Sequence, residues 1–169
     1  IQILKIFKAN IFTTVGNEFK KNICEELGAN VVINYNKDDF FKIIKEKTAK
    51  KGINLILDMV GGCYVQKNID LLSNDGRLIN IAYQKGSKIN LNLMKVMLKR
   101  LVITGSTLRI RDEDFKGDIL TKVEMNVFPK IKSGLIKPII DSVYDLNDVI
   151  KAHKRLYENK HIGKVVLSV

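Results

Sequence analysis

The stretch Gly52-Ile-Asn-Leu-Ile-Leu-Asp-Met-Val-Gly-Gly62 decides the fold expected for this chain. It is apolar from Leu55 to Leu57 and reaches Asp58 shortly before a pair of glycines. A short run of branched apolar residues between glycines predicts a strand buried on both faces of a parallel sheet. Open α/β sheets bind ligands at the carboxyl ends of their strands, and glycines there let the backbone approach a bound molecule or adopt positive φ. The alternative is a strand followed by a tight turn without a ligand.

Strands and helices alternate on both sides of this stretch, and this alternation predicts a parallel sheet with crossover helices. The expected strands cover residues 10–15, 31–34, 52–60, 78–82 and 101–105, and the expected helices cover 17–27, 37–47, 64–72 and 91–99, with a turn at 74–77. After Arg111 we expect one long helix over 112–131, interrupted by Pro129, then a strand at 137–144, a helix at 146–157 capped by Asp145 or Asn147, and a strand at 162–169.

The length of 169 residues predicts one domain, or one domain and a piece of another. No apolar run reaches the roughly 18 residues that a membrane span needs. The first eight residues are apolar at helical spacing, interrupted by lysines, and lack the features of a signal peptide. They resemble a helix cut open, so we expect the chain to begin inside a longer protein.

The net charge of +11 raises the possibility of a nucleic-acid partner. The lysines, however, are spread over nearly every segment, and basic and aromatic residues do not alternate as in a single-strand binder. We therefore expect a solvated basic surface and neither a nucleic-acid nor a membrane partner. Cys24 and Cys63 form no CxxC pair, which is consistent with a reducing, cytoplasmic location and gives no support to a structural zinc site.

The end of the first expected strand carries no acid. In a dinucleotide-binding unit the second strand ends on a carboxylate that binds the ribose 2′-hydroxyl of NAD. Here the corresponding strand ends at Gly16 and Asn17, and Lys20 follows one helical turn later. A neutral tip with a nearby cation suits a 2′-phosphate, and Tyr35 at the next strand end could lie beside it. The alternatives are a solvated surface lysine and a partly buried tyrosine.

Two further observations limit the chemistry. The glycine-rich phosphate fingerprint is absent and would have to precede Ile1. His153 and His161 have no partners at metal-ligand spacing, and Ser106 is not in a GxSxG elbow. The residues from Ser106 to Arg111 supply hydroxyls and arginines after a strand, which could meet a carboxamide, a phosphate or a neighbouring chain.

Several segments, taken in chain order, resemble the medium-chain dehydrogenase/reductase superfamily, and most closely its zinc-independent, NADPH-dependent quinone oxidoreductase branch (the ζ-crystallin-like enzymes). The similarity covers essentially the whole chain. The segments that carry it are Val15-Gly-Asn-Glu-Phe-Lys20, Leu27-Gly-Ala29, Ile33-Asn-Tyr35, Asp58-Met-Val-Gly-Gly62, Asp75-Gly-Arg77, Gly105-Ser-Thr-Leu-Arg-Ile-Arg111, Ile136-Lys-Pro138 and Asn159-Lys-His-Ile-Gly-Lys-Val-Val-Leu167.

The resemblance implies an α/β fold with a Rossmann-like doubly wound parallel sheet that lacks its first strand. Residues 1–125 would form this partial nucleotide-binding domain. Residues 126–169 would be the C-terminal segment that returns to a missing GroES-like catalytic domain. The parent enzyme would be a homodimer, paired through edge strands around residues 101–106, and residues 1–169 would be inactive by themselves.

The resemblance also implies NADPH as the cofactor and matches residues of this chain to its parts. Lys20 and Tyr35 match residues that bind the adenosine 2′-phosphate, beside a turn formed by Gly16 and Asn17, although serine or threonine is common at position 17. The nicotinamide side is matched by Asp58, Val60, Gly61, Gly62, Leu108 and Arg109, and the cofactor at the domain cleft by Asn159 and Lys164.

The implied reaction is hydride transfer from NADPH to a quinone or enone, with the cofactor carrying the chemistry. No catalytic acid or base and no metal ligand is expected in this chain, because orientation and desolvation would supply the catalysis. An enoyl thioester reductase of the same superfamily and a non-enzymatic basic binding module are the alternatives. A zinc alcohol dehydrogenase is less favoured, and its ligands would lie upstream.

Overall fold

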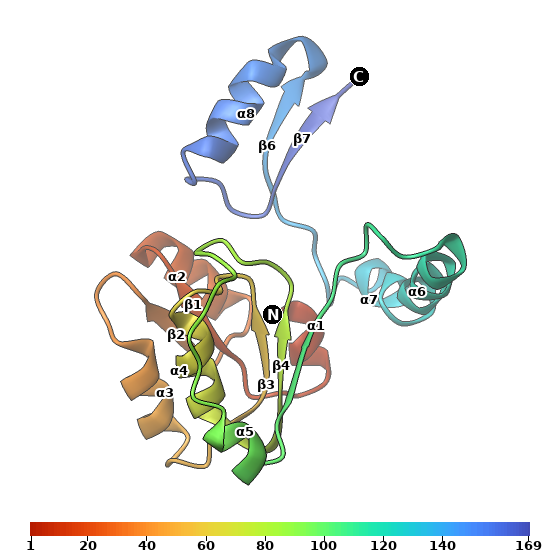
Figure 1. The fold of residues 1–169 in the computed structure, drawn as a ribbon. Coiled ribbons are helices and arrows are strands. Elements are labelled where there is room, and N and C mark those ends of the chain that lie inside the picture. Colours follow the sequence, from red (N-terminus) through yellow and green to blue (C-terminus); the bar gives the residue numbers. More distant parts are fainter. The chain divides into compact units, whose positions relative to one another are not determined.

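The computed structural model describes residues 1–169, and Figure 1 labels their helices and strands. The chain divides into two compact units. The central unit contains residues 14–16 and 33–116. The terminal unit contains residues 1–13, 17–32 and 117–169. None of the helices is both long and apolar enough to cross a bilayer.

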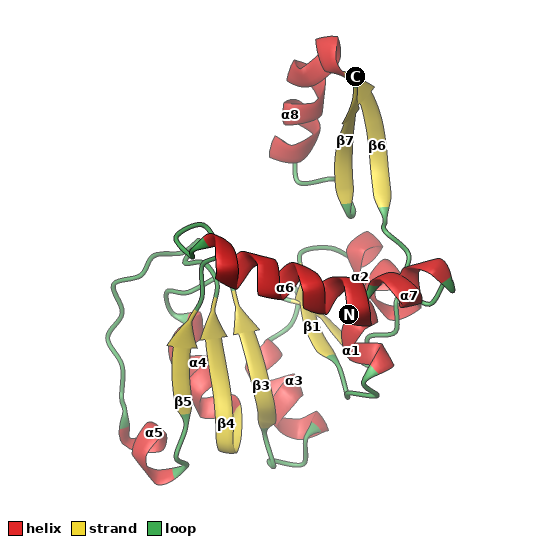
Figure 2. Cartoon of the chain, turned by 90° about the vertical axis from the view of Figure 1, so that its right-hand side faces the viewer, coloured by secondary structure: helices red, strands yellow, loops and turns green.

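The central unit is built on a three-stranded parallel sheet, visible in Figure 2. Its strands lie in the order β3 (Ile53–Asp58), β4 (Leu72–Asn80) and β5 (Val102–Gly105). Three helices connect or precede them: α3 (Phe40–Lys47), α4 (Tyr64–Leu71) and α5 (Met94–Leu98). The register places Asp58 beside Asn80 and Asn80 beside Gly105, so three strands end together at one edge.

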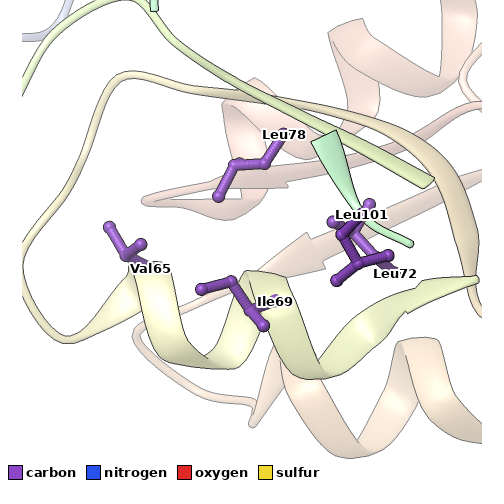
Figure 3. Close-up of a cluster of buried hydrophobic side chains, with 5 residues drawn as sticks. All are labelled: Val65, Ile69, Leu72, Leu78 and Leu101. Carbon is purple, nitrogen blue, oxygen red and sulfur yellow. The ribbon is translucent and has the colours of Figure 1, made fainter. Parts of the chain in front are cut away.

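The core of the central unit lies between α4 and the sheet (Figure 3). Val65 and Ile69 come from one face of α4, where residues four positions apart lie above one another. They meet Leu72 and Leu78 of β4 and Leu101 just before β5. Ile69, Leu72 and Leu78 are fully buried. This packing fixes the strand ends relative to the start of α4.

The prediction that β3 is buried on both faces is wrong for this chain. Leu55 and Leu57 are 51% and 61% exposed. β3 is the edge strand of its sheet, and the core formed with α4 lies on one face only. An unbroken apolar run indicates that both faces of a strand suit burial, but it does not show which segment covers them.

The predicted turn at residues 74–77 is part of a longer strand. β4 runs from Leu72 to Asn80, and the pairing with β3 jumps from Leu72 to Arg77 while β3 advances only from Ile53 to Leu55. The extra residues form an irregularity in which Asp75 has a φ of 58°. The turn-forming residues therefore produce a bulge rather than a strand end.

The terminal unit ends in a parallel β-α-β arrangement. β6 (Ile140–Asp145) pairs with β7 (Lys164–Ser168), and η1 (Leu146–Asp148) and α8 (Val149–Tyr157) connect them. Asp145 accepts a hydrogen bond from the Asn147 N–H, so Asp145 is the residue that caps this connection. The earlier helices of the unit are α1 (Gln2–Ile6) and α2 (Glu18–Glu26).

The single long helix predicted over residues 112–131 is instead two helices. α6 covers Glu113–Asn126, and α7 covers Phe128–Lys132. Pro129 lies in the first turn of α7. Proline has no N–H to donate, and the first turn is where helical N–H groups lack intrahelical partners, so Pro129 marks the start of a helix rather than a kink within one.

The remaining strands are β1 (Phe12–Val15) and β2 (Val31–Asn34), which form a separate two-stranded sheet. The Val31 N–H donates to the Ile11 carbonyl, and the Tyr35 N–H donates to the Val15 carbonyl. The residue numbers of the bonded partners increase together along the two strands, so the strands are parallel. In a Rossmann-type sheet the first strand lies between the second and the fourth. The division into a two-stranded and a three-stranded sheet agrees with the predicted fold that lacks this strand.

Candidate functional site

The ends of β1 and β2 bring together Gly16, Tyr35 and Asn36 in the central unit. A Cβ on Gly16 would lie 2.8 Å from the Tyr35 hydroxyl oxygen, so a larger residue there would displace the phenol. The Asn36 Nδ2 donates to the Gly16 carbonyl at 2.7 Å, and the Tyr35 N–H donates to the Val15 carbonyl at 3.0 Å. Tyr35 remains 41% exposed. The predicted neighbours Gly16 and Tyr35 are therefore in contact, with the phenol accessible.

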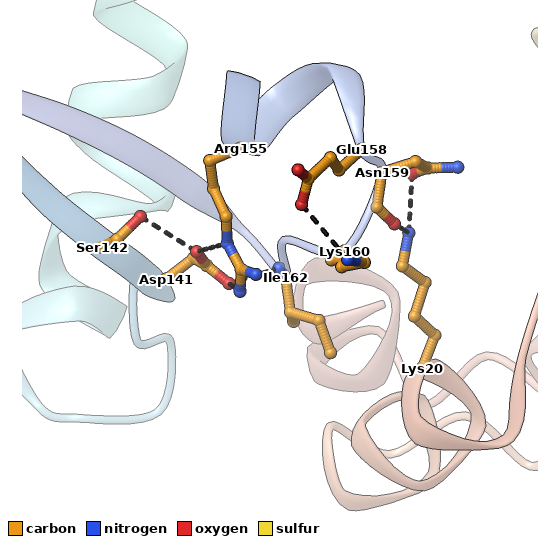
Figure 4. Close-up of polar contacts among 8 residues, drawn as sticks. All are labelled: Lys20, Asp141, Ser142, Arg155, Glu158, Asn159, Lys160 and Ile162. Carbon is orange, nitrogen blue, oxygen red and sulfur yellow. Dashed lines mark hydrogen bonds and ion pairs between the residues drawn. The ribbon is translucent and has the colours of Figure 1, made fainter. Parts of the chain in front are cut away.

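Asn17 and Lys20 begin α2 in the terminal unit. The Asn17 Oδ1 accepts a hydrogen bond from the Lys20 N–H at 2.8 Å, so Asn17 is the N-cap of α2. Its amide oxygen therefore holds the helix start. The Lys20 side chain is half-buried, and its Nζ donates to the backbone oxygen and the Oδ1 of Asn159 at 2.8 and 2.7 Å (Figure 4). The structure thus pairs two of the predicted site residues.

The carboxylate of Asp58 organises the turn after β3. Asp58 is 4% exposed. Its Oδ1 accepts from the N–H groups of Val60 and Gly61 at 2.7 and 3.2 Å, and its Oδ2 accepts from Asn68 Nδ2 at 3.1 Å. A buried carboxylate needs such donors. Asp58 therefore shapes the backbone of the turn, and its assignment as a cofactor contact stays a prediction.

Positions 61 and 62 need glycine because a neighbouring loop packs closely against them. Both have positive φ, 68° and 54°. A Cβ on Gly61 would lie 2.7 Å from Tyr83 Cδ1, and one on Gly62 would lie 2.7 Å from the Lys85 carbonyl oxygen. Backbone bonds from Gly62 N to Gly86 O and from Lys85 N to Val60 O join the two loops. The sequence predicts that a ligand packs closely against these glycines. In the structure, residues 83–86 of the chain itself pack against them.

The other predicted site residues lie on exposed segments. Leu108 and Arg109 follow β5, and Leu108 is 52% exposed. Asn159 has a φ of 52° in the turn between α8 and β7. Lys164 is the exposed first residue of β7, and its N–H donates to the Ile139 carbonyl at 2.9 Å.

Asn36 and Asn80 are polar residues at strand ends that were not predicted from the sequence. Asn36 holds the Gly16 carbonyl. Asn80 is 5% exposed at the end of β4, in register with Asp58, and its Oδ1 has no hydrogen-bond partner. An asparagine inside the apolar run 78–82 was the available signal for Asn80. For Asn36 the only signal was its position directly after a strand.

The titratable side chains do not form a metal centre, since no group of three or more His, Cys, Asp or Glu side chains is placed to hold an ion. The aromatic ring of Tyr64, at the start of α4, stacks on Phe40 at a centroid distance of 4.9 Å. Burial raises the pKa of the Tyr64 hydroxyl, so this residue remains protonated around neutral pH.

Parallel strands, crossover helices and glycine-bearing turns at the carboxyl ends define an α/β domain of the Rossmann class. Residues 1–124 match the family described as zinc-binding dehydrogenase. Human quinone oxidoreductase is 28% identical over 167 residues, which are 98% of this chain and 49% of the human protein.

Two solved structures extend the comparison. The crystal structure of Escherichia coli quinone oxidoreductase complexed with NADPH is 28% identical with a TM-score of 0.83, covering 99% of this chain and 52% of that one. The crystal structure of an NAD-dependent alcohol dehydrogenase is 29% identical with a TM-score of 0.78, covering 99% and 46%.

The chain belongs to the zinc-binding dehydrogenase family, within the medium-chain dehydrogenase/reductase superfamily and its quinone oxidoreductase-like branch. It spans about half the length of the relatives it matches. The predicted family and the predicted α/β fold class are confirmed.

Proposed function

We propose that this chain is the cofactor-binding half of an NADPH-dependent oxidoreductase that transfers hydride to a quinone or an enone. The observation that carries the proposal is the end of β1. The phenol of Tyr35 lies against Gly16, and the next helix, α2, which is capped by Asn17, bears Lys20 in its first turn. The E. coli quinone oxidoreductase of the same fold was solved with NADPH.

Charge at the strand tip favours a phosphate over a ribose hydroxyl. Residues 16 and 17 at the strand end are neutral, so neither supplies a carboxylate to bind a 2′-hydroxyl or to repel a phosphate, and the nearest acid is Glu18 in the first turn of α2. Lys20 supplies a cation, and the exposed Tyr35 hydroxyl supplies a hydrogen-bond donor. The resemblance to the quinone oxidoreductases assigns both residues to the 2′-phosphate that distinguishes NADPH from NADH.

The chain's own residues would then hold and orient the cofactor, which supplies the hydride when bound. The carboxylate of Asp58 fixes the turn at Val60 and Gly61, so the backbone at the end of β3 is set before any ligand arrives. Met59 and Leu108, 47% and 52% exposed, would supply apolar cover that excludes water. We assign the contacts on the nicotinamide side to this turn and to Leu108 and Arg109.

The test is titration of NADPH and NADH into the complete protein that contains this chain. Lys20→Ala should weaken NADPH binding about 10- to 100-fold and leave NADH binding unchanged, because one hydrogen bond to a charged group is lost. Lys21→Ala removes the neighbouring charge and serves as the matched control. An equal loss for both cofactors would remove Lys20 from the phosphate site.

The titration also tests the non-enzymatic alternative. If neither cofactor binds and nucleic acid binds with a steep salt dependence, the chain is a basic binding module. A lack of zinc, a homodimer paired through residues 101–106 and a cytoplasmic location stay predictions. The exposed Val102 and Ile103 of the edge strand β5 support the dimer.

A further inference from the structure

The turn between α8 and β7 carries a polar network that includes the hydrogen bonds between Asn159 and Lys20. In this turn Asn159 has left-handed backbone, a conformation that asparagine tolerates better than most residues. Its backbone oxygen and its Oδ1 converge on the Lys20 Nζ at 2.8 and 2.7 Å (Figure 4). Two contacts from one residue fix the end of an otherwise flexible side chain.

Asp141 on β6 anchors this turn from the other side. Its two oxygens accept from the Arg155 Nε and a terminal guanidinium nitrogen of Arg155, both at 2.9 Å. The Ile162 N–H donates to Asp141 Oδ1 at 2.9 Å, and the Ser142 hydroxyl donates to Oδ2 at 3.0 Å. The Asp141 side chain is 8% exposed. One carboxylate thus joins β6, α8 and the turn, as Figure 4 shows.

Backbone packing holds the turn in the same place. Gly163 has a φ of 82°, and a Cβ there would lie 2.2 Å from the Ile139 carbonyl oxygen. The turn is therefore fixed at Ile162 by Asp141 and at Gly163 by close backbone contact. Asn159 lies between this fixed end and the end of α8.

From these contacts we propose that Asn159, held in place by Asp141, positions the Lys20 ammonium and thereby sets the preference for the 2′-phosphate of the cofactor. The inference rests on the proposed function of Lys20. An ammonium has three N–H donors. Asn159 receives two of them and leaves the third for a phosphate oxygen. Because the side chain is already ordered, less rotamer freedom is lost when the phosphate binds.

Asp141 and Arg155 are positioning residues in this proposal, since they act through the turn. The prediction that follows is a selective one. Loss of Asn159 should weaken binding of NADPH and leave binding of NADH unchanged. Loss of Asp141 should have the same selective effect, because Asp141 acts through Asn159. A merely structural role of Asp141 would change both cofactors alike.

The experiment is a double-mutant cycle measured by NADPH and NADH titration in the complete protein. Asn159→Ala should weaken NADPH binding about fivefold, the effect of about one ordinary hydrogen bond. Asp141→Asn should weaken NADPH binding by no more than about fivefold. Because Asp141 acts through Asn159, the double variant should bind NADPH as weakly as Asn159→Ala alone. If Asp141→Asn does not fold, Arg155→Lys breaks the paired contact while keeping the charge.

Asp148→Asn is the matched control, because it removes an exposed ion pair with Lys151 from the same β-α-β arrangement. Unchanged or tighter NADPH binding in Asn159→Ala, or additive effects in the cycle, would overturn the proposal. Lys20→Ala is measured in parallel. If it loses NADPH selectively while Asn159→Ala does not, the proposed function stands and only the positioning role fails.

Discussion

Two aspartates organise two glycine-bearing turns in this chain, and they use different partners. Asp58, at the end of β3, accepts hydrogen bonds only from neutral groups: two backbone N–H groups and the amide of Asn68. Asp141, on β6, accepts a paired contact from the guanidinium of Arg155 and single bonds from Ser142 and a backbone N–H.

The difference shows that a buried carboxylate can stabilise a single turn or can connect segments that are distant in the sequence. The backbone donors of Asp58 lie within three residues, so its charge shapes a single turn without a cation nearby. Asp141 reaches residues 14 and 21 positions away, and the cation helps to offset the cost of burying the charge. The contact with the Arg155 guanidinium is the main reason that the pKa of Asp141 lies well below its usual range.

Gly61→Val should have the largest effect on the local turn. The new side chain would meet Tyr83 and the Gly86 carbonyl oxygen, and it would force a branched residue into positive φ. We expect a loss of about 3–5 kcal/mol in the free energy of unfolding, measured by urea denaturation without cofactor. Gly86→Ala is the control: its φ is 98° but no atom lies within 4 Å of the new Cβ. Equal losses would show that backbone strain alone matters.

Asp58→Ala should have a smaller effect. The substitution leaves the N–H groups of Val60 and Gly61 and the amide of Asn68 without an acceptor. We expect a loss of about 2–3 kcal/mol in the same measurement, since a buried unsatisfied donor carries a desolvation penalty. Exposed Asp38→Ala should change little. A loss for Asp58→Ala no greater than that of Asp38→Ala would mean that the turn forms without its carboxylate.

The pH dependence of stability should show the smallest effect and should single out Asp141. Its pKa in the folded protein is depressed, so its stabilising contribution is present above the unfolded value of about 4 and is lost as the pH falls below it. The difference in melting temperature between wild type and Asp141→Asn should therefore be greatest near neutrality and shrink between about pH 4 and 3. A constant difference over this range would contradict the ion-pair account.

Local sequence patterns were sufficient for most of the secondary structure. Asp145 or Asn147 was the predicted cap of the helix at 146–157, and Asp145 caps its start at η1, because a cap depends on residues only a few positions away. Gly28 follows α2 with positive φ for the same reason. The patterns failed where the partner was distant: the apolar run predicted a strand buried on both faces, but Leu55 and Leu57 of β3 are exposed.

The sequence by itself determined the alternating α/β order, the helix caps and the family, because each depends on spacing and residue type along the chain. Only the tertiary structure decided which groups meet. It placed Asp58 inside its own turn, set Gly61 against Tyr83, and joined Lys20 to Asn159 across 139 positions. Hydrogen bonds and close packing act through space, so a linear pattern can indicate that a residue is suited to such a contact but not which residue provides it.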